Sequence, residues 1–219
     1  NRADARFDEL PQVLIDALIS TEDARFASHS GIDFIALARA IAYMGKRGGG
    51  STITQQFAKL LFTDQYERTT WLERALLQKP KEWIIAARLE RFYTKGEILA
   101  LYLNRYDFLN QAVGIKSAAS IYFDKEVMEL DVHEAAMLVG MLKNSSLYNP
   151  LRRPESVHGR RNVVFGQMVR YGILDSTQLD SLRSLPLGLN YQRVSHDAGP
   201  APYFREILRA KLKTLLVEK

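Results

Sequence analysis

The sequence predicts a mainly α-helical fold. Apolar residues recur at every third or fourth position along most of the 219 residues, the spacing that gives a helix one apolar face. Hydrophobic residues make up 47% of the chain, enough to bury a full core in one main domain. Capping patterns and isolated prolines and glycines divide this pattern into helices of ordinary length. The only segment with strand character is residues 189–194.

Three helices are expected in the first part of the chain. Their apolar positions cover residues 13–18, 34–41 and 53–61. The glycine-rich residues 45–50 form a loop before the third helix, and Ser51 is a suitable N-cap for it.

Pro80 interrupts a helical pattern that otherwise runs over residues 69–92. Because proline lacks the backbone donor that a helix interior needs, we expect a kink or a break near Lys79. Further helices are expected after the capping boxes Thr94–Glu97 and Asp131–Glu134, over residues 160–171 up to Gly172, and from Pro202 onward, with turns at 148–150 and 153–154 and a linker at 196–202.

The composition limits the kinds of site and partner that the chain can have. The chain has no cysteine, which excludes disulfides, thiolate metal sites and cysteine nucleophiles. A net charge of +5 favours partners that carry phosphate, although a merely solvated basic surface gives the same value. No apolar run is long enough for a membrane-spanning helix, so any anchor or export signal is expected outside these residues.

Two segments suggest a transferase site. Glu22 and Asp23 end an apolar helix, where burial can turn a carboxylate into a base, although such a pair is more often a solvated helix end. Residues 48–50 precede a helix start that carries hydroxyl and amide side chains and one lysine, which suits a polar or anionic substrate. Those side chains are Ser51, Thr52, Gln55, Gln56 and Lys59. An ordinary helix cap is the simpler alternative.

Two basic clusters follow. The first cluster lies near one side of a predicted helix and consists of Arg74, Lys79, Lys81 and Glu82. The flanking tryptophans indicate that this side forms the wall of a cleft rather than a solvated face. Residues 152–153 and 160–161 are arginine pairs without interleaved aromatic residues, so phosphate or lipid-headgroup contact, or helix capping, fits them better than nucleic acid.

In order, these segments resemble the peptidoglycan glycosyltransferases of family 51, found as a domain of class A penicillin-binding proteins. The resemblance spans nearly the whole chain. It rests on Glu22-Asp23-x-x-Phe26-x-x-His29-x-Gly31, Gly50-Ser51-Thr52-Ile53-Thr54-Gln55-Gln56-x-x-Lys59, Lys79-x-Lys81-Glu82, Lys95-x-Glu97-Ile98-Leu99-x-x-Tyr102-Leu103-Asn104, and Tyr148-Asn149-Pro150 leading to Arg160-Arg161.

The resemblance implies a lysozyme-like helical lobe with a smaller membrane-facing jaw subdomain. It implies polymerisation of lipid II into β-1,4 glycan, with inversion and release of undecaprenyl pyrophosphate. Glu22 matches the general base and Glu82 the second essential glutamate. The residues expected to bind substrate are Asp23, Phe26, His29, Ser51, Thr52, Gln55, Gln56, Lys59, Arg74, Lys79 and Lys81. Mg²⁺ or Mn²⁺ is the expected cofactor, with no assigned metal ligands.

The resemblance also sets boundaries and partners. Residues 1–196 are expected to form the glycosyltransferase domain, and residues 197–219 a linker toward a transpeptidase domain outside this chain. The expected partners are lipid II, the growing lipid-linked glycan and the outer face of the bacterial cytoplasmic membrane, with no nucleic acid. Gln78 and Leu60 depart from the residues that many relatives carry.

Two other functions remain open. A lytic or hydrolytic muramidase would use Glu22 as an acid, and a non-catalytic module would bind glycan or membrane without turnover.

Overall fold

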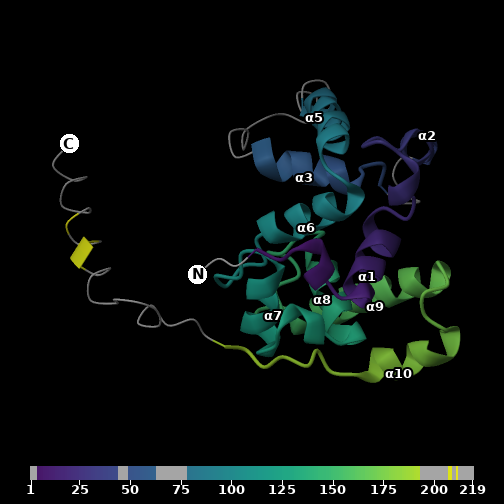
Figure 1. Ribbon diagram of the computed structural model, residues 1–219. Coiled ribbons are helices and arrows are strands. Elements are labelled where there is room, and N and C mark those ends of the chain that lie inside the picture. The colour runs from purple at the N-terminus through teal and green to yellow at the C-terminus, as the bar shows by residue number, and fades with distance from the viewer. Residues whose placement is uncertain (1–3, 44–48, 63–77, 193–206, 209–210, 212–219) are drawn as a thin grey trace.

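The computed structural model describes residues 4–43, 49–62, 78–192, 207–208 and 211, and it confirms the mainly helical prediction (Figure 1). Within these residues no strand is assigned, and the one β-type pairing is an isolated bridge between Asp107 and Val113. The helices are α1 (Gln12–Glu22), α2 (Phe34–Ala42), α3 (Ile53–Phe62), α5 (Lys79–Phe92), α6 (Lys95–Arg105), α7 (Ile115–Phe123), α8 (Val132–Met141), α9 (Pro154–Arg170) and α10 (Leu179–Ser184), with 3₁₀ turns at Phe7–Glu9, Phe26–Ser28, Val127–Glu129 and Ser176–Gln178.

Helix α8 lies at the centre of the core. Residues 134–141 are all buried, and the helix packs against α1 and α9. Both capping boxes predicted from the sequence are present, at the starts of α6 and α8. In each box the glutamate of the first turn bonds the N-cap backbone, so these helix starts are fixed by local sequence.

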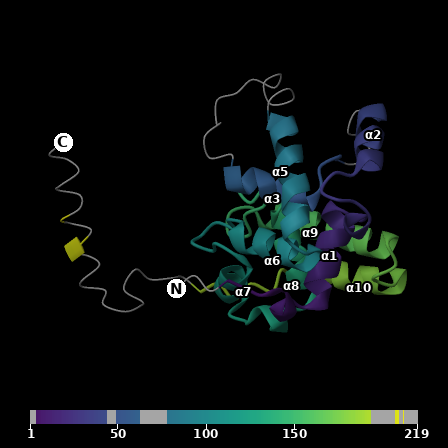
Figure 2. The same ribbon diagram turned by 45° about the horizontal axis from the view of Figure 1, so that its top comes forward.

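Helices α2, α3 and α5 lie together at one end of the molecule, and α7 and α10 lie toward the other (Figures 1 and 2). Helix α3 packs against α5 and α6, whereas α2 buries only Ala36. Phe34, Ile35 and Ile41 of α2 are about 70% exposed (69%, 69% and 71%). No helix of the described residues is long and apolar enough to cross a bilayer.

Two prolines start helices. Pro80 occupies the first turn of α5, which begins at Lys79 as the predicted break requires; residues 69–77 lie outside the described part of the chain. Pro154 was expected to mark a turn, but it begins α9, so this helix starts six residues before the expected Arg160. The first helical turn needs no backbone donor from proline, which makes this position favourable. Gly172 adopts φ +73° just after α9, where a helix end was predicted.

The expected strand at residues 189–194 is not present in the described residues. Residues 189–192 are extended, but their N–H groups pair with a helix end: Asn190 donates to the carbonyl of Tyr122 and Gln192 to that of Ile121. The last carbonyls of a helix have no partner within it, so α7 supplies acceptors where no strand edge is available. Residue 194, the linker at 196–202 and most of the final helix lie outside the described residues.

The buried side chain of Arg161 holds residues 182–186 in place. Arg161 of α9 is 0% exposed, and burial lowers its pKa below the ordinary value. Its guanidinium donates to the carbonyl oxygens of Leu182, Arg183, Leu185 and Pro186, the last two at 2.7 Å. The carbonyls at the end of α10 are thereby satisfied by a side chain of α9.

Candidate active site

Glu22 is the last residue of α1, and its carboxylate is held from two sides. Gln56 Nε2 donates to one oxygen at 2.9 Å, and Arg160 Nη2 lies 3.4 Å from the other. The side chain of Glu22 is 14% exposed and that of Arg160 is 11% exposed. Both contacts hold the carboxylate in one orientation, because each offers it a donor.

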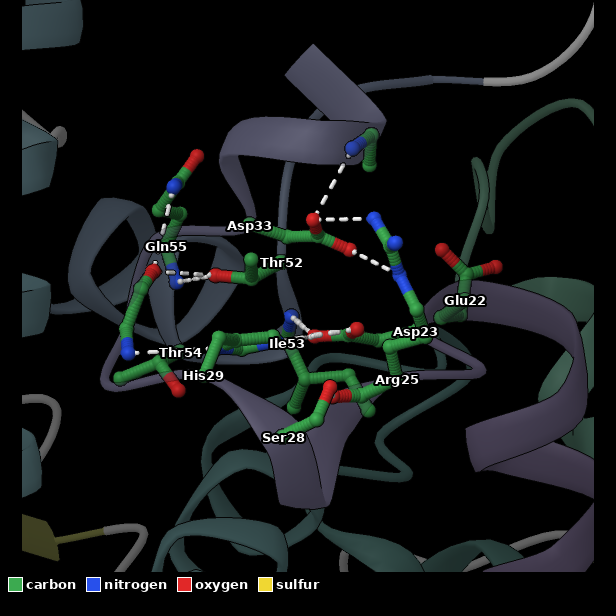
Figure 3. Close-up of polar contacts among 12 residues, drawn as sticks. Glu22, Asp23, Arg25, Ser28, His29, Asp33, Thr52, Ile53, Thr54 and Gln55 are labelled. Atoms are coloured by element: carbon green, nitrogen blue, oxygen red, sulfur yellow. Dashed lines mark hydrogen bonds and ion pairs between the residues drawn. The ribbon is translucent and has the colours of Figure 1, made fainter. Parts of the chain in front are cut away.

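Asp23 points away from Glu22 and anchors the start of α3 (Figure 3). Its carboxylate accepts from the backbone N–H of Ile53 at 3.1 Å and lies 3.0 Å from His29 Nε2. His29 Nδ1 accepts from the N–H of Gly31, so the proton of this ring lies on Nε2 and is donated to Asp23. Phe26 is 2% exposed and meets the His29 ring edge-on. These first-motif side chains build the base of the site; their direct contact with substrate stays a prediction.

Thr52, rather than Ser51, caps α3. Its hydroxyl accepts from the N–H of Gln55 and donates to the carbonyl of Gly31 at 2.7 Å. The Gln55 amide donates to the same carbonyl at 3.1 Å. The cap belongs to Thr52 because its side chain is buried against Gly31, which leaves the hydroxyl of Ser51 to accept from Lys79 at 3.0 Å.

A second carboxylate lies at the start of α5. Glu82 is 7% exposed and pairs with Lys79 at 2.7 Å. Lys59 comes from the exposed side of α3, and Lys81 is exposed on the first turn of α5. Arg74, which was expected to bind substrate, lies outside the described residues.

Glu22 and Glu82 line two different pockets, which adjoin each other. The larger, of about 1100 Å³, contains Glu22 with a set of cationic side chains: Arg25, Arg39, Lys143, Arg160 and Arg170. The smaller, of about 370 Å³, contains Glu82 with Gln55, Lys59, Lys79, Tyr102 and Tyr106. Ser51, Gln56 and Lys143 line both pockets, so they form a shared wall. The arrangement offers room for two polar ligands, each beside a carboxylate and cations.

Several cations of this site were not among the expected substrate-binding residues. Arg160 had a signal in the sequence, as part of the last resembling segment, but its partner Glu22 lies 138 residues away. Lys143 follows the apolar α8 with no pattern around it. Arg39 and Arg170 come from α2 and α9, which meet only in three dimensions.

A protein-made metal site is not present among the described residues. No group of three or more His, Asp or Glu side chains there could hold an ion. Glu22, Asp23 and Glu82 already face Arg160, His29 and Lys79 respectively. These donors do not fit the expected Mg²⁺ or Mn²⁺, which stays a prediction from resemblance.

The chain is similar to penicillin-binding proteins. It is 38% identical over 215 residues to penicillin-binding protein 1A of Pseudomonas aeruginosa, covering 96% of this chain and 25% of the relative. It is 36% identical to penicillin-binding protein 1A of Escherichia coli and to penicillin-binding protein 1F of Bacillus subtilis, covering 24% and 29% of them. The chain therefore spans about a quarter of the length of the curated relatives it matches.

A solved structure supports the fold. The crystal structure of penicillin-binding protein 1A from Haemophilus influenzae matches 96% of this chain and 21% of its own, with a TM-score of 0.55 at 23% identity. A family model described as transglycosylase matches residues 1–169. These residues include every described side chain of the two pockets except Arg170 and Tyr171. The chain belongs to the transglycosylase family.

Proposed function

We propose that this domain is a peptidoglycan glycosyltransferase that joins lipid-linked disaccharide units into β-1,4 glycan. The observation that carries the proposal is the pair of adjoining pockets, one around Glu22 and one around Lys79 and Glu82, with a shared wall between them. A transfer reaction brings two substrates together, and a hydrolase needs only one. Membership of the transglycosylase family supports the same reaction.

Glu22 is suited to act as the general base. Gln56 and Arg160 hold its carboxylate at the edge of the larger pocket, where it can accept a proton from a bound ligand. In the proposed step it takes the proton of the acceptor's 4-hydroxyl while that oxygen bonds to the anomeric carbon of the donor. A positioned base contributes roughly 10² to 10⁴ in rate.

The smaller pocket is suited to the donor. When the new glycosidic bond forms, the bond from the anomeric carbon to the pyrophosphate breaks, and the leaving group departs with the electron pair. Lys59 and Lys79 line this pocket and would stabilise the developing negative charge. The Lys79–Glu82 pair holds the ammonium beside Ser51, so the cation is positioned before substrate binds.

The alternatives fit the geometry less well. A muramidase cleaves a single glycan and releases no pyrophosphate, so it has no use for a second, lysine-lined pocket beside the first. A module that only binds glycan would not require a partly buried carboxylate inside a cation-rich pocket.

A membrane surface is the proposed setting, at the outer face of the bacterial cytoplasmic membrane. Phe34, Ile35 and Ile41 on α2, with Phe62 of α3, are exposed apolar side chains at the end of the molecule formed by α2, α3 and α5 (Figure 1), and α2 and α3 also contribute residues to the pockets. This end would be the membrane-facing jaw, and it would present the pockets to lipid-linked substrates. A fused transpeptidase domain, with residues 197–219 as linker, belongs to the same proposal.

The test is a polymerisation assay with purified lipid II, with glycan products separated on a gel. Glu22→Gln should remain folded and lose at least ~10²-fold in rate. Asp180→Asn is the matched control, because that carboxylate is 96% exposed on α10. Normal polymerisation by Glu22→Gln would remove the proposed base. Cleavage of polymeric peptidoglycan by the unaltered protein would favour the muramidase, and binding without turnover would favour the module.

A further inference from the structure

A buried tyrosine lies behind the proposed base. Tyr102 of α6 is 1% exposed, and its hydroxyl lies 2.9 Å from Gln56 Oε1. The other end of the same amide, Nε2, lies 2.9 Å from the carboxylate of Glu22. Tyr102, Gln56 and Glu22 therefore form a hydrogen-bonded chain, with one residue each from α6, α3 and α1.

The donor and the acceptor in each of these two hydrogen bonds can be assigned. The amide oxygen of Gln56 only accepts and its nitrogen only donates, whereas a hydroxyl can do both. Burial, followed by the negative charge of Glu22, holds the pKa of Tyr102 well above its ordinary value, so the phenol keeps its proton. Among the described residues the hydroxyl has Gln56 as its hydrogen-bond partner and no second acceptor. A buried donor without an acceptor is unfavourable, so the hydroxyl donates to Oε1.

We propose, on the basis of the function proposed above, that Tyr102 is a positioning residue for Glu22: its hydroxyl fixes the Gln56 amide so that Nε2, and not Oε1, faces the carboxylate. In this orientation the amide stabilises ionised Glu22 and has no acceptor to offer a protonated one. Without the hydroxyl, the amide of Gln56 is free to turn over. Oε1 can then accept a hydrogen bond from the O–H of protonated Glu22, and the preference for the ionised base weakens.

The other groups that face Glu22 stay in place when this hydroxyl is removed. Arg160 reaches it from α9, and Lys143, after α8, lines the same pocket. Tyr106, the residue that follows α6, is close enough for the charge of Glu22 to contribute to its raised pKa, after burial. Asp23 adjoins it along the chain and bonds His29. A change in the titration of Glu22 in Tyr102→Phe therefore reports on the amide.

A direct role in substrate binding is the competing explanation, since Tyr102 also lines the smaller pocket. The two roles differ in kinetics. Loss of a donor contact raises KM for the lipid-linked donor at every pH. Loss of the amide orientation lowers turnover most on the acid side, because less of the base is ionised there.

The experiment follows the carboxyl ¹³C signal of Glu22 against pH in protein labelled at glutamate, with the signal assigned by Glu22→Gln. Tyr102→Phe should move the titration midpoint to higher pH by about one unit, a typical consequence of losing a charge-stabilising hydrogen bond. Tyr122→Phe is the matched control: its buried hydroxyl donates to the carbonyl of Phe108 at 2.7 Å, and we expect no shift.

Gln56→Met provides a second variant, which removes the amide and keeps the length of the side chain. It should shift the Glu22 midpoint in the same direction. An unchanged midpoint in either folded variant overturns the proposal. The acid limb of the polymerisation rate should move with the NMR midpoint in Tyr102→Phe. If the unaltered protein fails to polymerise lipid II, the proposed function fails, while the ¹³C titration still decides the role of Tyr102.

Discussion

Asp23→Asn should destabilise the protein although it preserves shape, because the carboxylate accepts from two donors at once. Ile53 N–H and His29 Nε2–H both point at it. Both donors reach Oδ2, and His29 Nε2 also lies 3.1 Å from Oδ1, so the NH₂ group of an asparagine faces the His29 donor even when its oxygen takes the Oδ2 position. His29 cannot adapt by moving its proton to Nδ1, because that atom accepts from the N–H of Gly31.

The magnitude follows from these contacts. His29 Nε2–H then shares one acceptor with Ile53 N–H and opposes an NH₂ group, at a position that is 7% exposed, at a cost of about 1–3 kcal/mol. Loss of the negative charge at the N-terminus of α3 adds about 0.3–1 kcal/mol. We expect the free energy of unfolding to fall by about 1–4 kcal/mol, measured by urea unfolding at neutral pH with far-UV circular dichroism.

Asp180→Asn again serves as the control, with an expected change within about 0.5 kcal/mol because the side chain is exposed. A fall of less than about 1 kcal/mol in Asp23→Asn would show that the site accommodates the amide, and it would refute the assignment of the His29 proton.

Two further predictions concern stability. Burial acts to raise the pKa of Asp33, but hydrogen bonds from Arg25 and Ala36 outweigh it and hold the pKa below the ordinary 3.8. The ionised side chain therefore stabilises the fold above that pH, and the stability is lost as pH falls through the lower folded-state pKa. The difference in unfolding free energy between the unaltered protein and Asp33→Asn should accordingly shrink in urea titrations repeated below about pH 4. Gln111 is exposed and adopts φ 69°, a backbone conformation that is strained for a residue with a Cβ. Gln111→Gly should therefore raise the free energy of unfolding by about 0.5–1 kcal/mol, whereas Gln111→Ala, which keeps the Cβ, should not. Equal free energies of unfolding for the two variants would contradict this backbone strain.

Local rules explain the parts of the fold that could be predicted. Thr94 and Glu97 are three residues apart, so the start of α6 could be deduced from neighbours in sequence. Pro154 is ambiguous locally, because proline suits both a turn and a first helical turn. The extended residues 189–192 have the composition of a strand, and only the free carbonyls of α7 decide what they pair with.

In the candidate site, too, the residues within local motifs could be predicted, and the contacts between distant segments could not. Glu22, Glu82 and Lys79 stood out because their motifs carry their own spacing. The contacts that define the environment of Glu22 come from Gln56, 34 residues away, and Arg160, 138 residues away. No periodicity in the sequence encodes such a pairing, since it depends on how α1, α3 and α9 pack.

The buried guanidinium of Arg161 has a consequence for where the folding unit ends. The family match stops at residue 169, yet two of the carbonyls that this charge needs belong to Leu185 and Pro186. A protein cut at residue 169 would lose these acceptors together with the segment that covers the guanidinium, so a charged side chain of α9 would stand where the intact protein has packed residues. The family model and the folding unit therefore have different C-terminal limits, and the second is expected to reach at least Pro186.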